Sequence, residues 1–126
     1  MKNIIYLIIV LFTFQICNGQ IKCSKLKNGV FELKSEVGTT IIERKGNIQI
    51  EKIDGLNYYS EVEWIDDCKY ILKNHRNQNG ELEKEELNCI YTVEIIEIEK
   101  DSIKIRTSAN YSNKVIERTL KILKLK

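Results

Sequence analysis

The sequence predicts an all-β protein. About eight antiparallel strands are expected to follow one another as a meander and to form an up-and-down barrel or a strongly curved sheet, lipocalin-like in outline. Two observations lead to this fold class. Apolar and polar residues alternate over short runs, which is the period of a half-buried strand. Turn-forming residue pairs separate those runs at short intervals, as in hairpins.

The alternation is clearest in the seventh expected strand. Ile103 and Ile105 share one face of it, and the intervening positions are Lys104 and Arg106. A strand with this pattern buries one face and exposes the other to water. The same alternation over residues 57–65 predicts a second strand of this kind.

Three residue pairs mark turns between the runs. Gly46-Asn47 and Asp54-Gly55 have the residues that tight hairpins need, because these residues tolerate a left-handed backbone. Lys100-Asp101 separates two further runs. Short turns join neighbouring strands, so the strand order is expected to follow the sequence.

The expected strands cover residues 29–34, 39–45, 48–53, 57–65, 68–74, 90–99, 102–109 and 114–124. Gly29 is expected to serve a turn at the start of the first. In the sixth, the apolar residues change from odd to even positions after Ile95, which indicates a bulge or burial on both faces. The eighth also fits helical spacing through Ile116, Leu120 and Leu123, so a short amphipathic helix is the alternative there.

The segment from Asn74 to Asn88 is polar and rich in asparagine and glutamate. It is expected to be a long hairpin loop with one helical turn at Glu83 to Leu87. Three aromatic side chains from the strands are expected to pack in the core, as large apolar residues usually do. They are Phe31, Trp64 and Tyr70.

The amino terminus has the features of a secretory signal peptide over residues 1–19. Lys2 supplies a positive charge, and an unbroken apolar run follows from Ile4 to Phe12, which matches the charged and apolar regions of such peptides. A transmembrane anchor would need about 20 apolar residues, but polar residues interrupt this run from Thr13 onward. The protein is therefore expected to be exported, to the periplasm, the outer membrane or the cell exterior.

The cleavage site is expected after Gly19. Cys17 and Gly19 place small residues three and one positions before Gln20, as signal peptidase requires. The alternative is that Cys17 becomes a lipidated first residue, which would anchor the protein to a membrane. The bulky Ile16 in front of it disfavours that alternative.

Residues 20–126 are expected to form a single β domain, because removing 19 of 126 residues leaves 107, the usual size of one domain. The whole chain has 20 basic and 18 acidic residues, and the removed segment holds only Lys2, so the remainder carries a net charge of +1. That balance gives no drive toward nucleic acid. The last thirteen residues carry five basic side chains and one acidic one. This excess of positive charge indicates a solvated strand edge or, alternatively, contact with an anionic surface.

Three cysteines remain after cleavage, so one disulfide and one free thiol are expected in an oxidising compartment. Loop closure stabilises each possible pairing by about 3 to 4.5 kcal/mol and does not choose between them. Cys23 and Cys68 both lie at expected strand ends, where a disulfide can form. Cys89 begins a strongly apolar strand and is expected to be a buried, inert thiol. No metal site is expected, because no CxxC occurs and Cys68 to His75 is not a ligand spacing.

No familiar catalytic or cofactor motif occurs, so neither catalytic residues nor a cofactor are predicted. The sequence has no GxSxG, no HExxH, no phosphate-binding glycine loop and no EF-hand. The only histidine, His75, lies in a polar run and is expected in a solvent-facing loop. Asp66-Asp67 is expected to form a turn. No neighbouring residue marks Glu85-Glu86 as an acid/base pair.

The chain resembles a family of small exported bacterial proteins with a β framework and no established activity. The resemblance rests on residues 23–31, 49–51 and 64–72, which hold a cysteine, a Gly-x-Phe strand and a Trp-x-x-x-Cys-x-Tyr element. It implies that Cys23 and Cys68 form the disulfide. Some members carry a label that names a type IV DNA topoisomerase subunit, but a chain this short and near neutral does not fit strand passage on DNA.

Two classes of function remain. The first is a non-enzymatic binding module of the cell envelope whose curved sheet holds a small apolar ligand or a protein partner. The second is a structural or assembly protein that acts through an edge strand or the basic C-terminal segment. Membrane association is expected only through a lipid on Cys17 or through that segment. An enzyme ranks third and would require that His75 face a cavity that also holds Asp66, Asp67 or Glu86.

Overall fold

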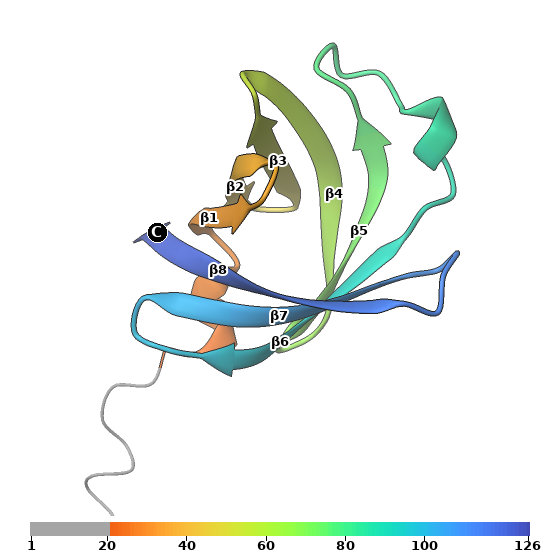
Figure 1. The fold of residues 1–126 in the computed structure, drawn as a ribbon. Helices are drawn as coiled ribbons and strands as arrows, with labels where there is room; N and C mark the ends of the chain where they lie inside the picture. Colours follow the sequence, from red (N-terminus) through yellow and green to blue (C-terminus); the bar gives the residue numbers. More distant parts are fainter. Residues whose placement is uncertain (1–20) are drawn as a thin grey trace, which may run out of the picture.

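The structure, a computed structural model, describes residues 21–126 (Figure 1). The signal peptide expected over residues 1–19, with Cys17 and the cleavage site, lies outside the described residues. Eight strands run in chain order: β1 (Gly29–Ser35), β2 (Gly38–Lys45), β3 (Ile48–Ile53), β4 (Leu56–Asp66), β5 (Lys69–Arg76), β6 (Tyr91–Ile98), β7 (Ser102–Ala109) and β8 (Val115–Leu125). Two short 3-10 helices accompany them, η1 (Cys23–Leu26) before β1 and η2 (Lys84–Glu86) between β5 and β6.

The strands form a closed barrel, which confirms the predicted fold class. Each strand pairs antiparallel with the next in sequence, and β8 pairs with β1 to close the circle. The segment after Lys114 is therefore strand β8, and the alternative of an amphipathic helix there is wrong. The bulge expected in the sixth strand is confirmed, because the pairing of β6 with β7 shifts register between Ile95 and Glu97.

The sequence suggested that Gly29 serves a turn, and this prediction is wrong. Gly29 is the first residue of β1 and lies where β1 pairs with β8 to close the barrel. A Cβ atom at this position would lie 2.7 Å from the carbonyl oxygen of Lys124 on β8. That distance is far shorter than ordinary van der Waals contact. The glycine is thus required by the close approach of the two backbones, not by a left-handed backbone conformation.

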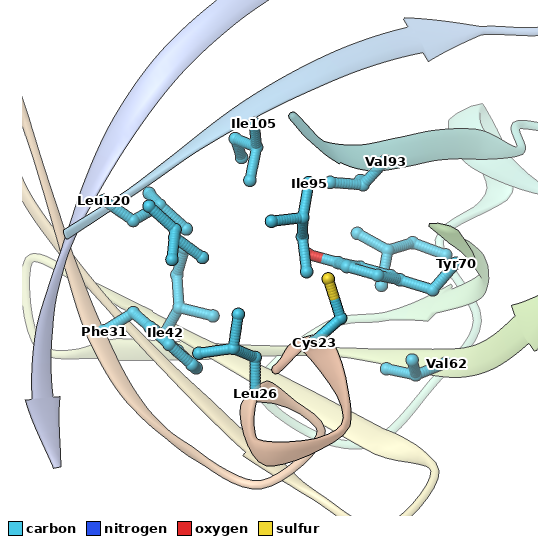
Figure 2. Close-up of a cluster of buried hydrophobic side chains, with 12 residues drawn as sticks. Cys23, Leu26, Phe31, Ile42, Val62, Tyr70, Val93, Ile95, Ile105 and Leu120 are labelled. Atoms are coloured by element: carbon cyan, nitrogen blue, oxygen red, sulfur yellow. The ribbon is translucent and has the colours of Figure 1, made fainter. Parts of the chain in front are cut away.

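One end of the barrel is filled and covered by η1. Leu26 from this helix is fully buried among side chains from the strands, and Cys23 lies beside it (Figure 2). Phe31 and Tyr70 are buried in the same core and Trp64 packs against it, as predicted. The core comprises Cys23, Leu26, Phe31, Ile42, Val62, Tyr70, Leu72, Val93, Ile95, Ile103, Ile105 and Leu120.

A disulfide joins Cys23 to Cys68, the pairing that the family resemblance implied. It connects η1 to the turn between β4 and β5 and so fixes the helix across this end of the barrel. Cys89 is unbonded. It precedes β6 instead of beginning it and is only half-buried, so the prediction of a fully buried strand thiol is wrong.

The strands pair incompletely toward the opposite end. β1 pairs with β8 only from Gly29 to Glu32, although β1 continues to Ser35. β5 pairs with β6 only from Lys69 to Leu72, although β5 continues to Arg76. The barrel therefore divides at this end into one leaf of five strands, β1 to β5, and one of three strands, β6 to β8. The two 3-10 helices lie at opposite ends, with η2 in the connection beside the divided end (Figure 1).

Within residues 21–126 no helix is both long enough and apolar enough to cross a membrane.

Candidate functional site

A cavity of about 650 Å³ occupies the barrel between the filled core and the divided end, and all eight strands contribute to its lining. Successive residues of a strand point to opposite faces, so every second side chain reaches the interior. The aliphatic part of the lining consists of Leu33, Ile42, Ile53, Leu72, Val93, Ile105, Ile116 and Leu120. Both the volume and the predominance of apolar walls are typical of small-molecule sites.

Polar side chains gather on one side of the cavity, where β3, β4 and β5 lie next to one another. β3 supplies Gln49 and Glu51, β4 supplies Tyr58 and Ser60, and β5 supplies His75. Pairing in the sheet explains this grouping, because Tyr58 lies directly opposite Glu51. The cavity thus has a polar side on three adjacent strands and apolar walls elsewhere, together with charged residues around its mouth.

Gln49 and Glu51 are linked on the polar side. The Gln49 amide nitrogen Nε2 donates a hydrogen bond of 3.1 Å to the Glu51 carboxylate. This bond fixes the orientation of the amide, because a carboxylate oxygen only accepts. The other amide atom, Oε1 of Gln49, is buried and has no hydrogen-bond partner among the described residues. A buried acceptor without a donor is costly, and such atoms are uncommon in folded proteins.

Burial raises the pKa of the Glu51 carboxyl above its ordinary value, and the negative charge of Glu86 adds to the effect. The hydrogen bond from Gln49, the nearby His75 ring and the positive charge of Arg118 act in the opposite direction and are outweighed. The folded protein therefore holds this proton to a higher pH than the unfolded chain does. Ionisation of Glu51 removes stability as the pH rises from the ordinary carboxyl pKa through the raised one.

His75 is buried, with 7% of its surface exposed, and lies within β5. The prediction of a solvent-facing loop histidine is therefore wrong, and a bulge explains the difference. Glu61 pairs with Lys73 and Tyr59 pairs with Arg76, so two residues of β5 oppose the single Ser60 of β4. Asn74, the extra residue, adopts a left-handed backbone with φ of 51°. Such a bulge re-aims the side chains that follow it, and here it turns His75 inward.

Both ring nitrogens of His75 are engaged. Nε2 donates to the carbonyl oxygen of Cys89 at 3.0 Å, because a carbonyl only accepts. Nδ1 lies 2.8 Å from the Ser60 hydroxyl, which donates to it in the neutral ring. The histidine therefore joins β4 and β5 to the connection that carries η2.

Tyr91 ties the same connection to the rim of the cavity. Its hydroxyl lies 3.4 Å from the Glu86 carboxylate, to which it donates, and 3.3 Å from the hydroxyl of Tyr111. Its ring meets that of His75 edge to face at 5.1 Å. Burial, followed by the hydrogen bond with Tyr111 and nearby acidic groups, raises the pKa of Tyr91. The hydroxyl therefore stays protonated and acts as a fixed donor at neutral pH.

The arrangement that an enzyme would require is present for one carboxylate of the three, because Glu86 lines the same cavity as His75. Asp66 and Asp67 lie where β4 ends and the turn to β5 begins, and the backbone amide of Asp67 donates to the Asp66 side chain at 2.8 Å. This end of β4 carries the disulfide turn, far from the mouth of the cavity. Because both nitrogens of His75 are held by Ser60 and Cys89, the ring is placed as a structural link, not as a free base.

Arg44 lies in the filled core below the cavity, against Tyr70, which lines the cavity. Its side chain is fully buried, and its guanidinium nitrogens have no hydrogen-bond partner among the described residues. The guanidinium lies instead over two aromatic rings, 4.6 Å from the centre of Phe31 and 4.7 Å from that of Tyr70. Burial raises the pKa of the Tyr70 hydroxyl despite the opposing charge of Arg44. Cation–π contacts with Phe31 and Tyr70 therefore stabilise the buried guanidinium.

The residues that line the polar side do not stand out in the sequence. Gln49 and Glu51 lie within a run that was expected to be a strand, and their alternation with Ile48 and Ile50 favours burial of the isoleucine face. The structure has the opposite face inside, since Gln49 is buried and Ile48 is exposed. Arg118 was counted with the basic C-terminal segment, but it reaches the cavity mouth. The inward position of Arg44 could have been inferred from the sequence. Arg44 follows the apolar Ile42 by two residues, so both side chains lie on the same face of β2.

Within residues 21–126 no group of three histidine, cysteine or acidic side chains is placed to hold a metal ion. No protein-family model matches the sequence, and no curated protein is significantly similar to it. The geometry of the barrel and its cavity is accordingly the basis for assigning a function.

Proposed function

We propose that this chain is an exported, non-enzymatic binding protein of the cell envelope that holds a small ligand in its barrel. The cavity of about 650 Å³ is the observation that carries the proposal. It combines aliphatic walls with a few polar groups on one side, which is how small-molecule sites provide both affinity and orientation. The floor is fixed by η1 and its disulfide, and access is from the divided end.

Substitution at the cavity mouth tests this proposal. Ile116 and Val115 are adjacent in β8 and similarly exposed, at 46% and 55%, but only Ile116 lines the cavity. The neutral fluorophore N-phenyl-1-naphthylamine should increase in fluorescence on entering the wild-type barrel. Ile116→Trp should weaken its binding by more than about fivefold by filling the mouth, while Val115→Trp should leave it unchanged. Equal effects of the two tryptophans would contradict a ligand cavity behind Ile116.

Export is supported by the charged and apolar amino-terminal pattern together with the disulfide. Disulfides persist in oxidising compartments such as the periplasm and the cell exterior. The Cys23–Cys68 bond also supports the resemblance to small exported bacterial proteins, which implied this pairing. We expect the intact mass of the product from its native cell envelope to correspond to a chain that begins at Gln20. A product that begins at Cys17 and is heavier by acyl chains would instead indicate a lipid-anchored protein.

The alternative of an assembly protein that acts through its C-terminal segment has less support. This segment is β8, which pairs with both β7 and β1 and contributes Leu120 to the core. It is therefore a part of the barrel itself and not a separable contact arm. Its deletion would disrupt the fold, so loss of association in such a variant would not identify a docking segment.

A further inference from the structure

We propose that the ligand is a cationic amine with an apolar body, whose ammonium group binds between Glu51 and Gln49 on the polar side of the cavity. This inference rests on the proposed function, because it names the chemistry of the molecule that the cavity would hold. It follows from three properties of the site: an unmet hydrogen-bond acceptor, an unpaired carboxylate, and the net charge of the lining.

The unmet acceptor is Oε1 of Gln49. This side chain is only 3% exposed, lines the cavity, and has its Nε2 committed to Glu51. Oε1 has no donor within the described part of the chain. A ligand that supplies an N–H group at this point would satisfy it, whereas a carboxylate or ether oxygen would not.

The unpaired carboxylate is that of Glu51, two residues along β3. None of the five ion pairs among residues 21–126 includes it. Among residues 21–126 its side chain accepts a hydrogen bond from Gln49, and oxygen lone pairs remain free for further donors. A charge held away from water and without an opposite charge is unfavourable, and a bound cation removes that cost.

The charge of the lining favours a cation as well. The acidic residues of the lining number four, Glu51, Glu83, Glu85 and Glu86, and the basic ones are Arg76 and Arg118. With His75 neutral the lining carries a net charge of −2, and the buried Arg44, which lies opposite Gln49 on β2, adds one positive charge behind it, so the balance of lining and floor is −1. Arg76 is further occupied, since its Nη1 donates to the carbonyl oxygen of Gly80 at 2.9 Å. A cationic ligand is therefore drawn to the cavity and an anionic one is repelled.

The neighbours of Glu51 suit the rest of such a molecule. Tyr58 lies opposite Glu51 on β4 and also lines the cavity, so an aromatic side chain is next to the carboxylate. An ammonium group at this point can contact both the charge and an aromatic ring. On the other side Glu51 pairs with Ile42 of β2, which belongs to the buried aliphatic wall. The apolar body of the ligand would lie against this wall.

Three ligands that differ only in the head group test the inference. Decylamine, 1-decanol and decanoate share a ten-carbon chain and present a cation, a neutral hydroxyl and an anion at pH 7. We expect decylamine to bind with a dissociation constant at least about tenfold below that of 1-decanol, and decanoate to bind most weakly. Isothermal titration calorimetry on the purified protein, and displacement of N-phenyl-1-naphthylamine, would both report the order.

The Glu51→Gln variant locates the effect. It keeps the size of the side chain and removes its charge, so the preference for decylamine should disappear while 1-decanol binds as before. Glu43→Gln is the matched control, because Glu43 lies on the neighbouring strand β2 on the outer surface, where it pairs with Lys52 at 3.3 Å. Thermal melts at pH 7 check folding, and Glu51→Gln should be at least as stable as the wild type, since burial disfavours the ionised carboxyl.

The outcomes separate the two proposals. Equal or tighter binding of 1-decanol or decanoate would overturn the amine inference and leave the binding function intact. A preference for decylamine that survives in Glu51→Gln would overturn the assignment to this carboxylate. Binding of the fluorophore without binding of any ten-carbon ligand would also overturn the amine inference. Failure of the fluorophore and of all three ligands would overturn the binding function itself.

Discussion

Replacing Cys68 with serine is expected to lower the free energy of unfolding by about 4 kcal/mol, because the disulfide closes a loop of roughly 45 residues in the unfolded chain. The bond also holds η1 across the filled end of the barrel. The helix has four residues and makes no side-chain cap hydrogen bond at its amino end. Its position therefore depends on the disulfide and on the buried Leu26.

Urea unfolding with and without a reductant measures this effect. The reductant should destabilise the wild type to the level of Cys68→Ser and leave that variant unchanged. Cys89→Ser is the control, since Cys89 is unbonded and only half-buried, and it should unfold close to the wild type. Coincident unfolding of Cys68→Ser and the wild type under oxidising conditions would mean that the bond contributes nothing to stability.

Replacing Phe31 with alanine should destabilise the protein by about 3 to 5 kcal/mol, the usual cost of deleting a fully buried aromatic ring. The loss has two causes here. A cavity forms in the filled end of the barrel, and the guanidinium of Arg44 loses the ring that lies 4.6 Å from it. Because that guanidinium is buried and no residue from 21 to 126 forms a hydrogen bond with it, its aromatic neighbours are the groups in this part of the chain that offset its desolvation.

Phe31→Leu separates the two causes, because leucine fills much of the space but provides no aromatic face. A loss clearly smaller than that of alanine would assign most of the effect to packing, and a similar loss would assign it to the contact with Arg44. Val37→Ala is the surface control, since Val37 is 94% exposed in the turn after β1 and should change stability by less than about 0.5 kcal/mol. Alanine at Phe31 with as little effect as this control would contradict the assigned core.

The strand count, the turns and the fold class could be predicted because they depend on local patterns. The alternation around Ile103 and the hairpin pairs at Gly46 and Gly55 are properties of a few consecutive residues. The structure places a strand at each expected run and departs mainly at the strand ends. Gly29 shows what local reasoning misses, since the need for glycine comes from the backbone of Lys124, almost a hundred residues away.

The candidate site was less predictable because it depends on register between strands. His75 was assigned to a loop since its neighbours are polar, and only the bulge opposite Ser60 turns it inward. Gln49 and Glu51 occupy positions that alternate with isoleucines, so the local pattern favoured the isoleucine face as the buried one, and the structure reverses this. Long-range pairing decided the matter by placing Tyr58 and Ile42 beside Glu51 on the inner face.

The incomplete pairing of β1 with β8 and of β5 with β6 makes local stability unequal along the barrel axis. Near η1 the β1/β8 and β5/β6 pairs are formed and a covalent crosslink is present, so this end resists local opening. At the other end the two leaves lack cross-strand bonds to each other on both sides, so a smaller fluctuation separates them there. For the ligand proposed above, this inequality would allow entry and release through local opening of the divided end while the crosslinked end stays folded.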